Sequence, residues 1–128
     1  MNDERPTIVV VDDSASVRLF FEKSTMGLDL ELLTFASADE SLSLLETMQP
    51  TLLFIDIIMP DKDGLTFLQE LRKMPSQADT KVIVISSKDY AQDKMTAKEL
   101  GALDFVTKPM GTRTIQEIIE RYTGTQTL

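Results

Sequence analysis

The sequence contains no cysteine and no histidine among its 128 residues. Without cysteine, the chain has no disulfide framework, no thiolate zinc site and no cysteine nucleophile. Without histidine, it lacks the usual general base, the commonest metal ligand and any phosphohistidine of its own. Any chemistry must therefore depend on carboxylates, lysine, arginine and hydroxyl groups.

Long hydrophobic runs and export signals are missing too. No apolar run reaches the ~18 residues of a membrane span, and residues 1–5 lack the basic segment of a secretory signal. The length predicts a single domain, residues 1–128, large enough to bury a core without disulfides. We therefore expect a soluble, cytoplasmic protein with no membrane partner.

Basic charge is scarce and unevenly placed. The chain has 13 Lys and Arg against 21 Asp and Glu, a formal net charge of −8. Residues 1–64 hold 13 of the acids and 4 of the bases, whereas residues 65–128 hold 8 acids and 9 bases. Because nucleic-acid binding is driven by clustered lysine and arginine, we expect no nucleic-acid partner. The acidic first half instead favours binding of a cation.

Short apolar runs alternate with segments of helical spacing. The runs predict five strands buried on both faces, at 8–11, 32–35, 52–55, 82–85 and 105–106. The segments between and after them predict five helices. Ser14 or Ser16 caps the helix near 15–26, and Pro50 and Pro75 close two others. This alternation predicts a doubly wound α/β fold with a five-stranded parallel sheet, and a mixed α+β domain is the alternative.

Polar residues follow four of the five predicted strands. They are Asp12 and Asp13 after the first strand, Asp56 after the third, Ser86 and Ser87 after the fourth, and Thr107 and Lys108 after the fifth. Each alone has an ordinary explanation, such as a helix entry, a turn residue or a solvated lysine. Because the carboxyl ends of parallel strands meet at one edge of a sheet, their joint placement indicates a site.

The three aspartates would repel one another at that edge. Two carboxylates about 4 Å apart repel by about 4 kcal/mol at an effective dielectric constant of about 20. Oxygen ligands without histidine or cysteine suit Mg²⁺, and the charges of three aspartates, Mg²⁺ and Lys108 sum to zero. Such a site would accept the oxygens of a phosphoryl group.

Over about residues 7–122, the chain resembles the receiver domain of bacterial two-component response regulators. The segments that carry the resemblance are Val9-Val10-Val11-Asp12-Asp13-Ser14, Ile55-Asp56-Ile57-Ile58-Met59-Pro60-Asp61-Lys62-Asp63-Gly64, Ile85-Ser86-Ser87, Gly101-Ala102 and Lys108-Pro109. The resemblance implies a flavodoxin-like sheet with strand order 2-1-3-4-5.

The resemblance also implies a role for each residue of the site. Asp56 would accept a phosphoryl group from the phosphohistidine of a histidine kinase or a histidine phosphotransfer protein. Mg²⁺ would be held by Asp13, by Asp12 directly or through water, by Asp56 and by the backbone carbonyl of Ile58. The phosphoryl oxygens would be bound by Lys108, Ser86 and Ser87. The peptide bond between Lys108 and Pro109 is hypothesised to be cis.

Two further roles concern signalling and lifetime. Ser86 would move toward the phosphoryl group and let Phe105 turn inward, which would remodel the face of the fourth helix, fifth strand and fifth helix for a protein target or effector domain. An ordinary core position is the alternative for Phe105. Ile58 and Lys88 would tune the phosphoryl lifetime: Ile58 cannot position an attacking water, which predicts slow self-dephosphorylation, and Lys88 is an opposing influence.

Other functions fit the sequence less well. A phosphatase of the haloacid dehalogenase type also forms an aspartyl phosphate. A resemblance to that family would require a second Asp two residues after the nucleophile, where this chain has Ile58. An FMN carrier would need the loop after the first strand to wrap a phosphate, which Asp12 and Asp13 would repel. Residues 1–26 contain no glycine, which argues against dinucleotide and P-loop sites.

We therefore expect a signalling domain rather than an enzyme. A free-standing regulator is the first interpretation, and a domain from a longer regulator is the second. The remaining acids near the site, Asp61 and Asp63, are expected to be plain solvated surface.

Overall fold

A computed structural model describes residues 5–125. The strands are β1 (Thr7–Val11), β2 (Glu31–Phe35), β3 (Leu52–Asp56), β4 (Val82–Ser86) and β5 (Asp104–Thr107). The helices are α1 (Ala15–Thr25), α2 (Ala38–Leu45), α3 (Gly64–Arg72), α4 (Ala91–Glu99) and α5 (Thr112–Thr123), with a short 3₁₀ helix η1 (Pro75–Gln77). Within the described residues, no helix is long and apolar enough to cross a membrane.

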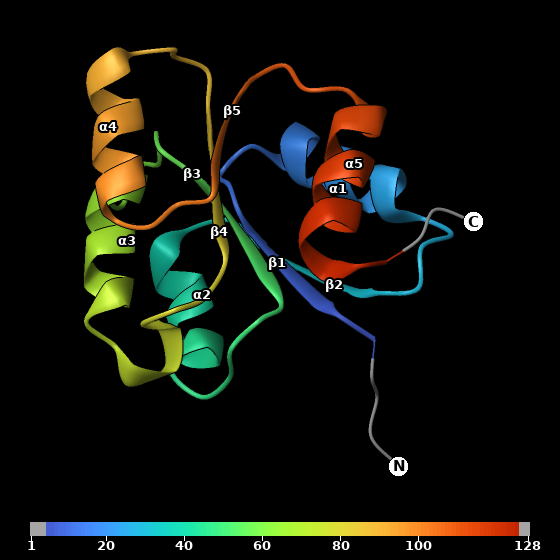
Figure 1. The fold of residues 1–128 in the computed structure, drawn as a ribbon, viewed down its shortest axis with the longest axis horizontal. Helices are drawn as coiled ribbons and strands as arrows, with labels where there is room; N and C mark the ends of the chain where they lie inside the picture. Colours follow the sequence, from blue (N-terminus) through green and yellow to red (C-terminus); the bar gives the residue numbers. More distant parts are fainter. Residues whose placement is uncertain (1–4, 126–128) are drawn as a thin grey trace.

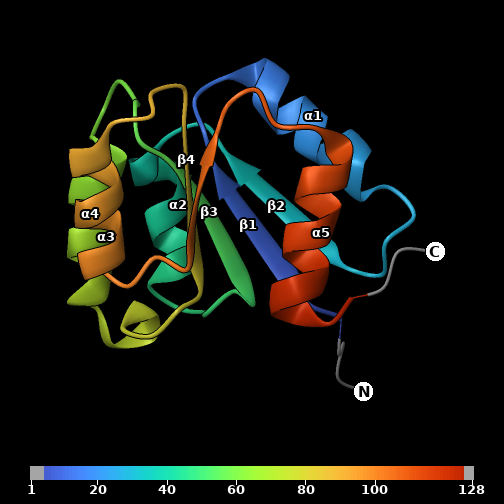
Figure 2. The same cartoon turned by 45° about the horizontal axis from the view of Figure 1, so that its top comes forward.

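The strands form one parallel sheet in the order β2-β1-β3-β4-β5. Helices α1 and α5 cover one face, and α2, α3 and α4 cover the other (Figures 1 and 2). This arrangement confirms the predicted doubly wound fold with five helices and the strand order implied by the resemblance. The connection that leaves β1 runs to β2 on one side, whereas the connection that leaves β3 runs to β4 on the other side, so a crevice opens between the carboxyl ends of β1 and β3.

The sheet separates two apolar cores. Because side chains alternate along a strand, Val9 and Val11 face the core under α2, α3 and α4, whereas Ile8 and Val10 face the core under α1 and α5. Strands β3 and β4 are buried along their whole length, as expected for strands covered on both faces. The most deeply buried strands, β3 and β4, therefore have their carboxyl ends at the crevice.

Acidic and hydroxyl side chains cap the helices that border the crevice. Of the two predicted caps for α1, Ser14 is the one used: its hydroxyl accepts a hydrogen bond from Val17 N at 3.3 Å. Asp63 caps α3, where its carboxylate accepts a bond from Leu65 N at 2.7 Å. Asp61 accepts one from Asp39 N in the first turn of α2, at 3.1 Å. Asp61 and Asp63 are exposed, as expected for solvated surface residues, and both also satisfy helix N–H groups.

Of the two helices predicted to close at a proline, one ends well before it. Helix α2 ends at Leu45, well before Pro50, because the buried Gln77 amide donates hydrogen bonds to the carbonyls of Leu45 and Met48, each at 2.7 Å. Helix α3 ends at Arg72, shortly before Pro75, as predicted. Pro75 also begins η1, in the first-turn position where proline loses no hydrogen bond.

Gly64 lies where α3 meets the end of β3. Its N–H donates to Ile57 O at 2.7 Å. A Cβ atom added to Gly64 would lie 2.1 Å from the carbonyl oxygen of Asp56. Only glycine therefore allows the start of α3 to approach this strand end so closely.

We predict that Gly64→Ala lowers the free energy of unfolding by about 2–3 kcal/mol, because the added methyl group forces α3 away from β3. Urea denaturation measures this change. The matched control is Gly111→Ala, which adds the same methyl group before α5 with no atom within 4 Å and should cost less than about 1 kcal/mol. Equal losses in the two variants would contradict the steric explanation.

Candidate functional site

Three predicted aspartates meet in the crevice. Asp12 follows β1 and is fully buried, Asp56 ends β3 and is 3% exposed, and Asp13 is exposed beside them. One carboxylate oxygen from each lies within 4.8 Å of the others. The structure therefore brings together acids that are far apart in sequence, as the strand-end argument predicted.

The backbone and side chain of Asp12 are held on several sides. Its N–H donates to Phe35 O at 3.0 Å, and its Oδ1 accepts from Ser14 N at 2.9 Å. The Arg18 guanidinium donates to the Asp12 carbonyl at 2.8 Å and so fixes the turn between β1 and α1. The sequence pattern did not identify Arg18. Only its position, just beyond the first turn of α1, could have suggested a contact with the turn between β1 and α1.

Lys108 links two of the acids. Its Nζ lies 2.9 Å from Asp12 Oδ2 and 3.3 Å from Asp56 Oδ1. Burial lowers the pKa of Lys108, but the nearby carboxylates outweigh this effect and the net pKa is raised. The Lys108 N–H donates to Ser86 O at 2.7 Å, and the Lys108–Pro109 peptide bond is cis, which confirms that hypothesis.

One ammonium group does not balance the charge of three carboxylates, whereas a hard divalent cation would. Asp12 Oδ2 is buried, and its partner among the described residues is the Lys108 ammonium 2.9 Å away. The three carboxylates face a single ammonium group and supply only oxygen ligands, which Mg²⁺ prefers. These residues therefore suit a metal centre.

The environment of Asp56 changes its protonation. Burial first, and the charge of Asp12 second, raise the pKa of Asp56 from 3.8 to about 6, although Lys108 opposes the shift. The side chain is thus poised between its two protonation states near neutral pH.

The other predicted residues surround the same strand ends. Ser86 is fully buried at the end of β4, and its hydroxyl accepts a hydrogen bond from Lys88 N at 3.0 Å. Ser87 and Lys88 are exposed beyond it, and Ile58 is 54% exposed in the loop after β3. Phe105 is half-buried on β5, so it is not a fully enclosed core residue.

We predict that metal-free protein loses stability through Asp56 as pH rises. Between about pH 4 and pH 6 the unfolded chain releases this proton while the folded chain keeps it, so the free energy of unfolding falls by about 1–3 kcal/mol. Asp56→Asn should lack this decrease, and the exposed control Asp29→Asn should keep it, in urea denaturation with a chelator from pH 4 to 7. Parallel curves for the wild-type protein and Asp56→Asn would refute the prediction.

Comparisons with known proteins agree with this geometry. The family model described as the response regulator receiver domain matches residues 8–120. The probable transcriptional regulator ycf27 of Porphyra purpurea is 32% identical over 116 residues, which are 91% of this chain and 46% of that protein. The chain thus spans about half the length of this relative.

Solved structures share the fold at lower identity. The chemotaxis protein CheY4 of Vibrio cholerae superposes with a TM-score of 0.85 at 22% identity, covering 92% of this chain and 98% of that one. The receiver domain of the sensor histidine kinase PA1611 of Pseudomonas aeruginosa has a TM-score of 0.82 at 19% identity, with 94% and 98% coverage. That structure has a magnesium ion coordinated in its active-site cleft. The family match over residues 8–120, together with the relative at 32% identity, shows that this chain belongs to the response regulator receiver domain family.

Proposed function

We propose that the chain is a phosphoacceptor, in which Asp56 receives a phosphoryl group from a phosphohistidine on a histidine kinase or a histidine phosphotransfer protein. The observation that carries this proposal is the position of the Asp56 carboxylate, buried at a strand end within reach of Asp12, Asp13 and Lys108. The chain has no histidine of its own, so the donor lies on another polypeptide or another domain.

Asp12, Asp13, Asp56 and the backbone carbonyl of Ile58 would hold Mg²⁺. The three clustered carboxylates, which have one ammonium group between two of them, support this assignment. Mg²⁺ supplies positive charge that offsets the carboxylates and the phosphoryl oxygens. Metal-bound relatives of the same fold, including Mn²⁺-bound Rcp1 and the PA1611 receiver domain with magnesium, are consistent with such a site.

The transfer exchanges one bond to phosphorus for another. An ionised Asp56 oxygen attacks the phosphorus, the bond from phosphorus to the donor imidazole nitrogen breaks, and that nitrogen keeps the electron pair. Lys108, already 3.3 Å from Asp56 Oδ1, is placed to hold the phosphoryl oxygens, and Ser86 and Ser87 supply hydroxyl groups. At neutral pH most Asp56 side chains are ionised, since the pKa of about 6 lies below 7.

Signalling follows from the position of Ser86. Movement of its hydroxyl toward the phosphoryl group would carry the loop that begins α4, and Phe105 would turn inward. The face formed by α4, β5 and α5 would then bind a protein target or effector domain differently in the two states. We propose neither nucleic acid nor a membrane as a partner. The proposed role is signalling rather than enzymatic turnover. We propose that residues 1–128 form a single receiver domain.

The phosphatase alternative remains disfavoured. A haloacid dehalogenase-type enzyme would need an acid two residues after the nucleophile to protonate the leaving group. Ile58 occupies that position, and an aliphatic side chain cannot transfer a proton.

We predict that acetyl phosphate with Mg²⁺ adds one phosphoryl group to the protein, measured by intact mass. Asp56→Ala should abolish the gain because it removes the acceptor. Asp29→Asn should react like the wild-type protein, since Asp29 lies outside the cluster. An Mg²⁺-independent gain, or the same gain in Asp56→Ala, would refute the proposed function.

We predict a long-lived phosphoryl group in the native chain and a several-fold shorter lifetime in Ile58→Asn. An amide at this exposed position can orient a water molecule, whereas isoleucine excludes one. Loss of the phosphoryl group is followed by intact mass after removal of acetyl phosphate. Met26→Asn, which changes a 75% exposed side chain at the end of α1, is the control and should keep the native lifetime. A native lifetime shorter than that of Ile58→Asn would contradict the prediction.

A further inference from the structure

One cation of α4 contacts two segments that the proposed switch would move. The Lys94 ammonium forms an ion pair with Asp89 in the loop after β4. The same ammonium lies 5.9 Å from the centroid of the Phe105 ring on β5. Lys94 thus joins the loop that follows Ser86 to the aromatic side chain next to α4.

Helix α4 is held firmly at only one of its ends. At its C-terminal end, the Arg72 guanidinium donates to Leu100 O at 2.8 Å and to Gly101 O at 3.3 Å. At its N-terminal end, Tyr90 provides no side-chain cap, and residues 87–90 are exposed. Ala97 is the one buried residue of the helix. The contacts of Lys94 therefore lie near the end of α4 that has the fewest other restraints.

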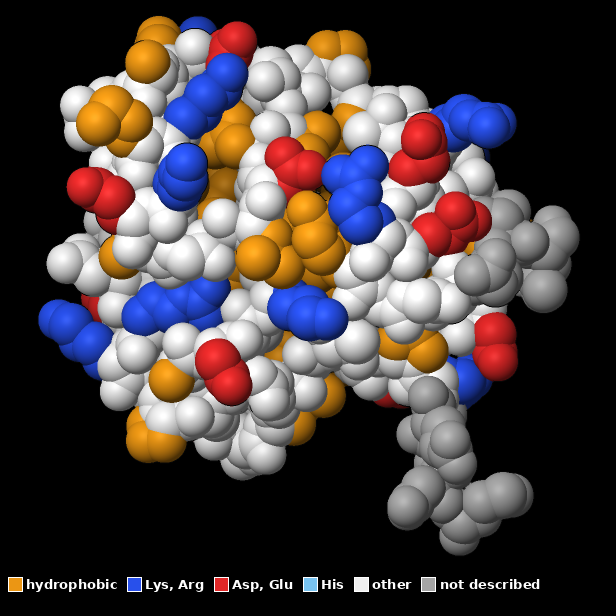
Figure 3. Space-filling view, viewed as in Figure 1, with side chains coloured by type: hydrophobic (Ala, Val, Ile, Leu, Met, Phe, Trp, Pro, Cys, Tyr) orange, Lys and Arg blue, Asp and Glu red, His pale blue; other side chains and the backbone are white. Residues whose placement is uncertain are grey.

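The ring of Phe105 has room to move while its backbone is fixed. Phe105 is paired with Val84 in the sheet register, and its N–H donates to the Asp104 carboxylate at 2.9 Å. The side chain lines a cleft of about 350 Å³ between α4 and β5, together with Lys94, Ala97 and Leu103. Figure 3 shows hydrophobic side chains in the hollow beside α4, with Lys and Arg side chains along its border.

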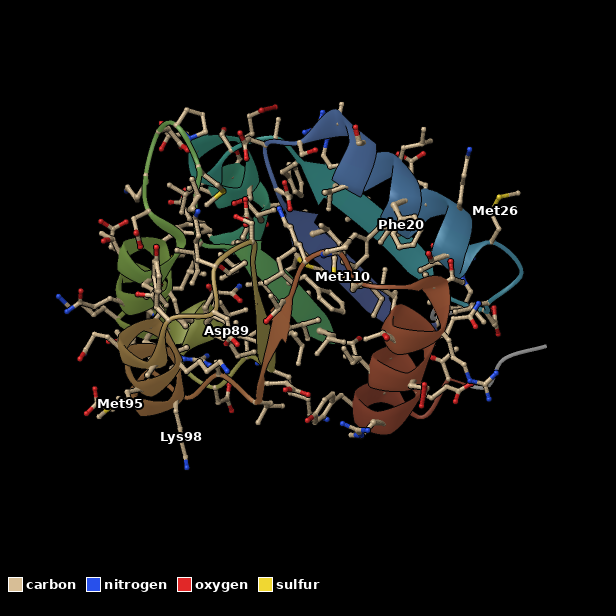
Figure 4. All side chains as sticks on the ribbon, turned by 90° about the horizontal axis from the view of Figure 1, so that it is seen from above. Phe20, Met26, Asp89, Met95, Lys98 and Met110 are labelled. Atoms are coloured by element: carbon tan, nitrogen blue, oxygen red, sulfur yellow. The ribbon has the colours of Figure 1, made fainter. Side chains whose placement is uncertain are left out.

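Neighbouring side chains of α4 do not make the contacts that Lys94 makes with Asp89 and Phe105. Met95 is 58% exposed, and Figure 4 shows Met95 and Lys98 pointing outward from the helix. Figure 4 also shows Asp89 in the loop between β4 and α4. Lys98 carries the same charge one helical turn after Lys94 and also lines the cleft. Among the described residues, however, only Lys94 forms the ion pair with Asp89 and lies over the Phe105 ring, so Lys98 provides an internal comparison.

We propose that Lys94 is a positioning residue that holds Phe105 under its ammonium group and so favours the unphosphorylated arrangement. The attraction between a cation and an aromatic face is lost when the ring turns inward. Because a contact present in only one state shifts the balance between states, Lys94 sets the fraction of molecules ready to switch. This inference rests on the proposed function, since it assigns a regulator to the same site.

The test compares Lys94→Gln, Lys98→Gln and Lys94→Arg without phosphorylation. Scalar coupling constants measured by NMR give the χ1 rotamer populations of Phe105 in each protein. Lys94→Gln should shift the ratio of these rotamers about two- to fivefold, in proportion to the strength of an exposed cation–π contact. Lys98→Gln removes the same charge and should leave the ratio unchanged. Lys94→Arg should keep the wild-type ratio, because guanidinium also packs on aromatic rings.

Phosphorylation provides a second measurement. With acetyl phosphate and Mg²⁺, Lys94→Gln should react faster by a similar factor, and Lys98→Gln should match the wild-type protein. An unchanged rotamer ratio in Lys94→Gln, an equal shift in Lys98→Gln, or a shift in Lys94→Arg as large as that in Lys94→Gln would overturn the inference. Absence of phosphorylation in every protein would instead refute the proposed function, while the rotamer ratios would still decide the role of Lys94.

Discussion

The crevice depends on the placement of one ammonium group between two buried carboxylates. Lys108 comes from the end of β5, Asp12 from the end of β1 and Asp56 from the end of β3, so a single pair of contacts ties three strands together. Buried charges are costly unless paired, and removal of one partner leaves the others uncompensated. The same contacts leave the site with more carboxylates than cationic groups, and this imbalance supports the proposed metal site.

The sheet explains why these groups can meet at all. All five strands are parallel, and the crossovers place every carboxyl end at the same edge. Strand β2, whose end offers only Ala36 and Ser37, lies at the outer side of the sheet and contributes a backbone carbonyl, that of Phe35, to hold Asp12. The completely buried strands β3 and β4 carry Asp56 and Ser86, so both side chains are attached to strands that are covered on both faces.

Sequence patterns predicted the strands and the acidic cluster well because both depend on local order along the chain. An apolar run followed by Asp12 or Asp56 can be recognised in the sequence without knowing which residues pack against it. The strand order came from the family resemblance, since periodicity indicates a parallel sheet but not the arrangement of its strands.

Features that depend on contacts between distant residues were not predictable in this way. The end of α2 is set by Gln77, which is distant in sequence from the carbonyls that it satisfies. The role of Arg18 depends on the path of one guanidinium group, and the contact of Lys94 with Phe105 depends on a side-chain orientation. Such geometry is fixed only when helices and strands have packed together.

The contact at Gly64 gives helix α3 a mechanical relationship to Asp56. With no side chain at this position, the first turn of α3 rests directly against the carbonyl group of Asp56. Residues 57–63 therefore form a closed loop of fixed span between a strand and a helix that touch each other. An added residue in this loop must therefore bulge away from the contact, whereas a deletion must break it and separate the start of α3 from the end of β3.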